Sequence, residues 1–181
     1  MNIGTVEYLK HKQPAHISAT FFEREPLLVA QSLLGKVIAV NSGTQWLMAR
    51  IIETEAYYRR EKASHSSLGY THKRKALFMS PGTIYMYYAR GGDSLNFSCL
   101  GDGNAVLIKS GYPVARYTDD PASILSMQNN NPNRDGSKRS LARLCAGQTL
   151  LCKSLNIKVS DWDTQQLKPH HLELWDDAYS P

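Results

Sequence analysis

The sequence predicts a single α+β domain, built on a curved, mostly antiparallel β-sheet with flanking helices. Three observations support this fold class. The middle of the chain alternates β-branched and aromatic runs with glycine-containing turns, which is typical of strands joined by tight hairpins. Apolar residues at helical spacing lie towards the two ends of the chain. The chain has 181 residues, of which 42% are hydrophobic, and its sequence contains no repeat, so one domain with one core is expected.

The first third of the chain contains a polar arm, a helix and two strands. Residues 1–20 are weakly patterned, and we expect a flexible or peripheral arm before a domain of residues 21–181. Apolar residues at helical spacing are followed by Gly35, a common end of a helix. Apolar runs then flank a turn at Asn41-Ser42-Gly43. In chain order, the predicted elements are a helix over 25–34, a strand over 36–40 and a long, bent strand over 46–57.

The rest of the chain continues with hairpins and ends with helices. Residues 59–75 are polar and basic, which predicts a surface loop. Glycine turns at residues 91–93 and 101–103 separate the next apolar runs, and the tail after residue 155 is polar. In chain order, the predicted elements are strands over 83–88, 94–99 and 105–108, a helix over 121–128, a loop over 129–136 and helical spacing over 141–155 with a potential interruption at Gly147.

The composition limits the partner and the compartment. The formal net charge is +5 with a pI near 9.1, which fits an acidic partner such as nucleic acid, although many basic proteins bind none. Cys99, Cys145 and Cys152 lack the spacing of a disulfide framework or a zinc site and are expected as buried thiols. No run is long and apolar enough for a membrane span or a signal peptide, so we expect a cytosolic protein.

The strand over 46–57 carries the first candidate site. Because side chains alternate along a strand, Ile51, Glu53, Glu55 and Tyr57 are expected on one face. A carboxylate positioned there is suited to accept a proton from water. The alternative is an edge strand with a solvated polar face, and this segment alone does not separate the two interpretations.

Basic residues and tyrosines suggest a nucleic-acid surface. Lys73, Arg74 and Lys75 lead into a strand on which Tyr85 and Tyr87 share a face, a combination suited to phosphate contact and base stacking. A second basic group is expected to contact backbone phosphates, and its members are Arg134, Lys138, Arg139 and Arg143. Solvated surfaces are the alternative for both groups. The sequence contains no phosphate-binding loop, serine-nucleophile elbow or metal motif.

An ordered set of segments between about residues 21 and 157 resembles the alkyladenine (3-methyladenine) DNA glycosylase family. Two of them are specific together, namely Glu53-Thr54-Glu55-Ala56-Tyr57 and the run from Phe78-Met79 to Tyr87. The other matching segments are Phe21-Phe22, Leu33-Leu34-Gly35-Lys36, His65-Ser66, Leu95-Asn96, the run from Gly101-Asp102-Gly103 to Ile108, Leu144-Cys145-Ala146-Gly147 and Leu151-Cys152.

The resemblance implies an activity and a partner. The family cleaves the bond between base and sugar of alkylated or deaminated purines, such as 3-methyladenine, 7-methylguanine, hypoxanthine and ethenoadenine, and leaves an abasic site. It flips the damaged nucleotide out of the duplex and uses neither a metal nor a covalent intermediate. We therefore expect a monomer that binds double-stranded DNA and needs no cofactor. It should act at the nucleoid of a bacterium or in the nucleus of a eukaryote. The resemblance also implies a barrel-like sheet similar to the C-terminal domain of formyltransferases.

The resemblance also assigns roles to residues. Glu55 matches the water-activating carboxylate, and Lys109 stands near it where the family commonly has arginine. Tyr57, His65 and Tyr87 match the pocket that sandwiches the flipped base, with His65 also reading the edge of the base. Asn96 matches the residue that obstructs the amino group of guanine.

The sequence departs from the family pattern at three places. Arg90 stands where the family has an intercalating aromatic residue, so it is expected to fill the gap left by the flipped base. Lys109 keeps the charge of arginine but not its planar fork. Gln148 and Leu150 replace the usual proline and lysine, and the family's later strand, rich in Arg, Gly and Ile, is not found before Pro181. Two alternatives to an active glycosylase therefore remain, a catalytically weak or inactive module that binds DNA or damage and an RNA-binding module.

Overall fold

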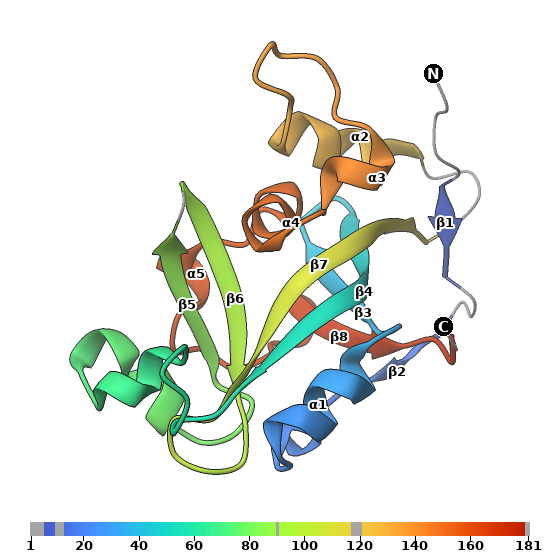
Figure 1. The fold of residues 1–181 in the computed structure, drawn as a ribbon. Helices are drawn as coiled ribbons and strands as arrows, with labels where there is room; N and C mark the ends of the chain where they lie inside the picture. The colour runs from blue at the N-terminus through green and yellow to red at the C-terminus, as the bar shows by residue number, and fades with distance from the viewer. Residues whose placement is uncertain (1–5, 10–12, 90, 117–120, 180–181) are drawn as a thin grey trace.

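The computed structural model describes residues 6–9, 13–89, 91–116 and 121–179. Their strands form one eight-stranded sheet in the order β2-β8-β3-β4-β7-β6-β5, with β1 paired to β7 (Figure 1). Every strand pairing is antiparallel except that of β1 with β7. The predicted α+β fold with a mostly antiparallel sheet is therefore confirmed. The sheet is open, since its described end strands β2 and β5 do not pair with each other.

The N-terminal segment contributes two short strands to this sheet. β1 (Glu7–Tyr8) pairs with β7, and β2 (Ala15–His16) pairs with β8. The sequence did not predict these strands, because two-residue strands carry no alternation that a pattern could show. The described part of the expected arm therefore lies at the margins of the sheet, where it is hydrogen-bonded to it.

The first helix and the two following strands agree with the prediction. The helix α1 (Pro26–Leu33) begins at a proline, whose fixed φ suits the first helical turn, and ends before Gly35, whose φ is 82°. The strands β3 (Val37–Asn41) and β4 (Trp46–Tyr57) pair with each other. The register of β4 against β7 (Ala105–Ala115) shifts on both sides of Glu53, as in a β-bulge. The predicted bend of the long strand thus has a local cause.

A hairpin forms the end of the sheet opposite β2 (Figure 1). Its strands are β5 (Ile84–Ala89) and β6 (Gly92–Ser98), and their register places Tyr85 opposite Asn96 and Tyr88 opposite Asp93. The preceding segment, predicted as a loop over residues 59–75, contains two short 3-10 helices, η2 (His65–Leu68) and η3 (His72–Phe78). Such helices are too short for apolar periodicity to reveal them.

The C-terminal third packs short helices on the sheet. These helices are α2 (Pro121–Asn130), α3 (Leu141–Leu144), α4 (Gln148–Leu155) and α5 (Val159–Trp162). A further 3-10 helix, η1 (Ala19–Phe22), precedes α1 near the start of the chain. Gly147, with a φ of 113°, separates α3 from α4, so the predicted interruption is confirmed. The last strand, β8 (Leu172–Asp176), pairs with β3 and was not predicted.

The core lies between the sheet and these helices. Phe22, Leu33, Ile84, Phe97 and Leu151 are among its fully buried members. The three cysteines are buried and free, as expected. Burial raises the pKa of the Cys99 and Cys145 thiols to about 12, so both are protonated at neutral pH. No helix within the described residues is long and apolar enough to cross a membrane.

Candidate active site and nucleic-acid interface

The candidate catalytic group lies where β4 and β7 run side by side. Lys109 Nζ is 2.9 Å from Glu55 Oε1, and the Tyr57 hydroxyl donates a hydrogen bond of 2.5 Å to Glu55 Oε2. The side chains of Glu55 and Lys109 keep 34% and 31% of their surface exposed. Glu55 and Tyr57 thus lie on one side of the strand, as alternation predicts, and the carboxylate is held at both oxygens while it still meets solvent.

These contacts decide the charge of Glu55. Burial alone would raise the pKa of its carboxyl group, but the hydrogen bonds from Tyr57 and Lys109, with the positive charge of Lys109, outweigh it and lower the pKa below its ordinary value. Burial and the neighbouring carboxylate raise the pKa of Tyr57, so its hydroxyl stays protonated and remains a donor. At neutral pH the group is therefore a carboxylate with two hydrogen-bond donors.

A small cavity adjoins this group. It has a volume of about 60 Å³ and is lined by Tyr57, Ala63, Ser64, His65, Leu77, Tyr85, Tyr87 and Asn96. The rings of His65 and Tyr87 are in contact, with centroids 4.4 Å apart. The four residues that the sequence predicted for a base pocket therefore come together in the structure, from β4, η2, β5 and β6. We call this cavity and its lining the base slot.

The fold around η2 sets the place of His65. The Ser66 hydroxyl donates to the carbonyl of Gly103 at 2.6 Å, and Arg74 donates to the carbonyls of His65 and Gly69 at 3.2 and 2.8 Å. His65 Nδ1 lies 3.0 Å from the Tyr85 hydroxyl, with the donor set by the tautomer. Burial, and then the charge of Arg74, lower the pKa of His65, which favours the neutral imidazole. Arg74 thus orders the wall of the base slot, and its predicted phosphate contact stays a prediction.

Asn96 and Tyr85 are buried members of the lining of the base slot. Asn96 is 4% exposed, and its Nδ2 donates to the carbonyl of Tyr85 at 3.1 Å. Tyr85, which the prediction placed on the same strand face as Tyr87, also lines the cavity. The place of Tyr85 in the base slot could thus be predicted from the alternation of the strand. Ala63 and Leu77 also line the slot, but they lie in irregular or 3-10 segments, where no alternation reveals them.

Glu53 has a partner that the sequence did not suggest. The Ser110 hydroxyl donates to Glu53 Oε2 at 2.7 Å and accepts a hydrogen bond from the amide of Gly147 at 3.1 Å. Ile51, which strict alternation would group with these carboxylates, is buried in the core. Of the two carboxylates, Glu55 is therefore the one next to the base slot, and Glu53 joins β4 and β7 to the start of α4.

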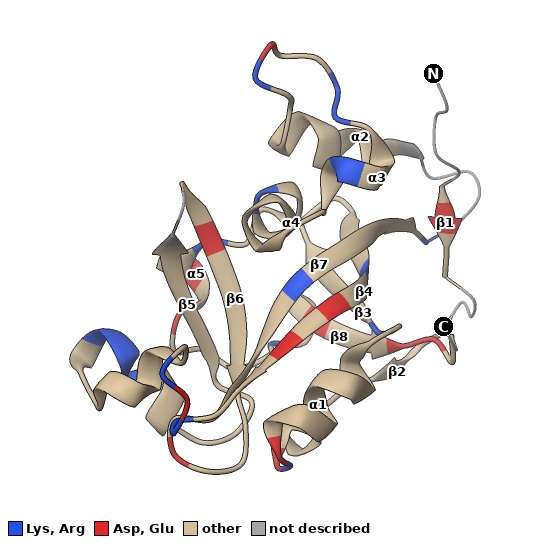
Figure 2. Cartoon of the chain, viewed as in Figure 1, with Lys and Arg blue, Asp and Glu red and all other residues tan. Residues whose placement is uncertain are grey.

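The two basic groups that the sequence predicted lie apart from each other, and other Lys and Arg residues lie on further elements such as β7 and α4 (Figure 2). Lys73 and Lys75 are on η3, close to the segment that carries His65. The second group lies in and beside the loop between α2 and α3: Arg134, Lys138 and Arg143 are exposed, and Arg139 donates to the carbonyls of Asn131 and Pro132. Arg90, predicted to fill the gap left by a flipped base, lies outside the described residues. Within the described residues, no group of three or more His, Cys, Asp or Glu could hold a metal ion.

The structure thus places the aromatic side chains of Tyr57, His65 and Tyr87 around a small cavity that adjoins an ionised carboxylate. The Methylpurine-DNA glycosylase (MPG) family matches residues 20–180 of the chain, so the chain belongs to that family. The resemblance found in the sequence is thereby confirmed.

Related bacterial proteins carry the same kind of name. A protein of Pseudomonas aeruginosa (strain UCBPP-PA14), named "Putative 3-methyladenine DNA glycosylase", is 60% identical over 162 residues, which cover 90% of this chain and 68% of that protein. A protein of the same name from Pseudomonas savastanoi pv. phaseolicola is 57% identical over 168 residues, 93% of this chain and 75% of the relative. A third, from Koribacter versatilis, is 40% identical over 107 residues, 57% of this chain and 52% of the relative.

Proposed function

We propose that this protein acts in base-excision repair by hydrolysing the N-glycosidic bond of alkylated or deaminated purines in double-stranded DNA. The candidate lesions are 3-methyladenine, 7-methylguanine, hypoxanthine and ethenoadenine, and the product is an abasic site. The observation that carries the proposal is the ionised Glu55 carboxylate, hydrogen-bonded to Tyr57 and Lys109 at the edge of an aromatic slot. Membership of the Methylpurine-DNA glycosylase family supports the same reaction.

Glu55 serves the chemistry in two ways. As the base leaves, the sugar acquires the character of an oxocarbenium ion, which a nearby carboxylate stabilises. The same carboxylate takes a proton from the attacking water, which then bonds to the sugar carbon while the base departs with the electron pair of the broken bond. Lys109 keeps the carboxylate ionised through its charge and its hydrogen bond.

The base slot supports recognition of a flipped base. Tyr57, His65 and Tyr87 all line the slot, and the rings of His65 and Tyr87 touch each other. The cavity of about 60 Å³ is small beside the roughly 300–1,000 Å³ of usual ligand pockets, so its walls have to separate to admit a purine. His65 Nδ1 is paired with the Tyr85 hydroxyl, so Nε2 is the ring nitrogen that can read a base edge, as donor or acceptor according to the tautomer.

A single-turnover cleavage assay tests the proposal. Purified protein is incubated with duplexes that carry one 7-methylguanine, hypoxanthine or ethenoadenine, and alkali then converts abasic sites into strand breaks. We expect breaks with the wild type and a loss of about 10²–10⁴-fold or more in rate with Glu55→Gln, because the proton acceptor is removed.

The neighbouring carboxylate gives a matched control. Glu53→Gln changes the same charge on the same strand, and its amide oxygen still accepts the hydrogen bond of Ser110, so cleavage should persist. Full activity of Glu55→Gln would refute the assigned role. Tight duplex binding without breaks on any lesion would instead indicate a binding module, and preference for single-stranded RNA would indicate the RNA-binding alternative.

A further inference from the structure

The hairpin of β5 and β6 has two different faces. Tyr85 and Tyr87 point into the base slot, whereas Tyr88 and Asp93, which lie opposite each other in the register, line a separate groove. This groove has a volume of about 520 Å³ and extends from the hairpin to α4 and to the segment that follows it. The base slot and the groove are therefore separated by the thickness of a two-stranded ribbon.

The groove is basic. Lys153, Lys158 and Arg139 line it, and both lysines are exposed. Among the residues that the structure describes, neither lysine forms an ion pair. The one carboxylate among the described lining residues is Asp93, whose Oδ1 accepts a hydrogen bond of 3.0 Å from the amide of Val159. The lysine charges thus remain available to an anionic partner.

The rim of the groove suits a polar, extended ligand. Asn156 adds an exposed amide group that can donate to phosphate or sugar oxygens, and Tyr88 is 71% exposed. Amide donors beside lysines on a long open surface are typical of contacts with a nucleic-acid backbone, which carries one charge per nucleotide.

The two faces then fit the two strands of one duplex. A ribbon that enters a groove of DNA has one phosphate backbone on each side. The flipped nucleotide enters the base slot, so the damaged strand passes along that face. We propose that the groove lined by Lys153, Lys158 and Arg139 binds the phosphates of the undamaged strand. This inference rests on the proposed function, because the strand assignment follows from which face receives the damaged nucleotide.

The experiment compares two double variants that remove the same charge from opposite faces. Lys153→Gln with Lys158→Gln changes the groove, and Lys73→Gln with Lys75→Gln changes η3 beside the base slot. Both are made with Glu55→Gln, which keeps the substrate uncleaved. Affinity is measured by fluorescence anisotropy on a hypoxanthine duplex whose phosphates near the lesion are replaced by neutral methylphosphonates in one strand or the other.

For the groove variant we expect about a tenfold loss of affinity. The slope of log affinity against log salt concentration should also become shallower, by about two released counterions. Neutral phosphates in the undamaged strand should lower the affinity of Glu55→Gln with an intact groove. They should cause little further loss of affinity in the groove variant. Neutral phosphates in the damaged strand should weaken both. The η3 variant should keep its sensitivity to the undamaged strand, which excludes a general effect of net charge.

Three results would overturn the proposal. The groove variant could keep its full affinity, it could lose affinity equally when neutral phosphates are placed in either strand, or the protein with an intact groove could fail to bind duplex DNA. The outcome is distinct from that of the proposed function. If the wild type cleaves no lesion but the strand-selective loss is observed, the glycosylase assignment falls and the strand assignment of the groove stands.

Discussion

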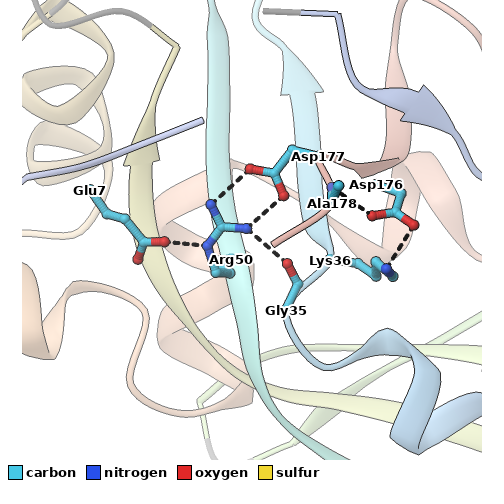
Figure 3. A network of polar contacts seen from close by, with 7 residues as sticks. All are labelled: Glu7, Gly35, Lys36, Arg50, Asp176, Asp177 and Ala178. Atoms are coloured by element: carbon cyan, nitrogen blue, oxygen red, sulfur yellow. Dashed lines mark hydrogen bonds and ion pairs between the residues drawn. The ribbon is translucent and has the colours of Figure 1, made fainter. Parts of the chain in front are cut away.

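Two charged clusters on the same strand, β4, have opposite properties. Arg50 is 2% exposed and donates to both carboxylate oxygens of Asp177 at 2.8 and 2.9 Å, to the carbonyl of Gly35 at 2.8 Å and to Glu7 (Figure 3). The Glu55 cluster, five residues further along, keeps about a third of its surface exposed and has fewer contacts.

The difference separates a structural use of charge from a chemical one. The guanidinium of Arg50 has each nitrogen bonded and joins β1, β4 and the segment after β8, so it connects both ends of the described chain to the centre of the sheet. Such a saturated, buried group cannot exchange protons with a substrate. Glu55 is held by only two donors and faces solvent, so water can reach it and give up a proton.

The comparison predicts its largest effect at Arg50. Arg50→Ala would leave the buried Asp177 without its main partner, and we expect the free energy of unfolding to fall by about 3–5 kcal/mol. Urea denaturation followed by circular dichroism measures this change. The folded fraction should cleave at the wild-type rate, since the base slot does not involve Arg50. A loss below about 1 kcal/mol, or a selective loss of cleavage, would contradict the structural role.

A second prediction concerns Lys109 and the pH dependence of cleavage. The rate should decrease as the pH falls through the pKa of Glu55, because the protonated carboxyl cannot accept a proton. Lys109→Gln removes the charged partner whose hydrogen bond and positive charge lower this pKa, so the acidic limb of the single-turnover rate should move to higher pH. The rate well above the limb should change less than the rate within it.

Two variants control this measurement. Lys109→Arg retains the charge and should keep the limb near its wild-type position, while Lys73→Gln, which removes an exposed charge, should leave it unchanged. An acidic limb that does not move in Lys109→Gln would show that Lys109 does not set the charge of Glu55.

The same contrast explains what could be predicted from the sequence. The bounds of β4, together with His65, Asn96 and the three tyrosines of the base slot, could be predicted because long alternating strands and the family segments carry local signals. Arg50 gave no such signal, since its partners lie 43 and 127 residues away in the chain. Long-range pairs of this kind depend on the tertiary fold.

Missed strands have a related cause. β7 extends to Ala115 through Gly111 and Pro113, two residues that weaken a strand pattern, although Pro113 pairs with Ala49 in the sheet. In β8, Glu173 lies between Leu172 and Leu174 and is itself buried, accepting hydrogen bonds from the Trp175 indole and the amide of His170. A buried glutamate satisfied by such contacts cannot be distinguished in the sequence from an exposed one.

The smallest effect is expected at the ion pair nearest the Arg50 cluster. Lys36 Nζ lies 2.7 Å from Asp176 Oδ2, and their side chains are 19% and 39% exposed (Figure 3). The hydrogen bond from Lys36 lowers the pKa of Asp176, so this contact stabilises the fold above the ordinary pKa of an aspartate. The stabilisation is lost as the pH falls through the lowered value.

Because water screens the pair, Asp176→Asn should reduce the free energy of unfolding by less than about 1 kcal/mol at pH 7. The difference between variant and wild type in urea denaturation should shrink towards zero on acidification. A loss as large as that of Arg50→Ala would show that exposure does not distinguish the energetic contributions of the two ion pairs.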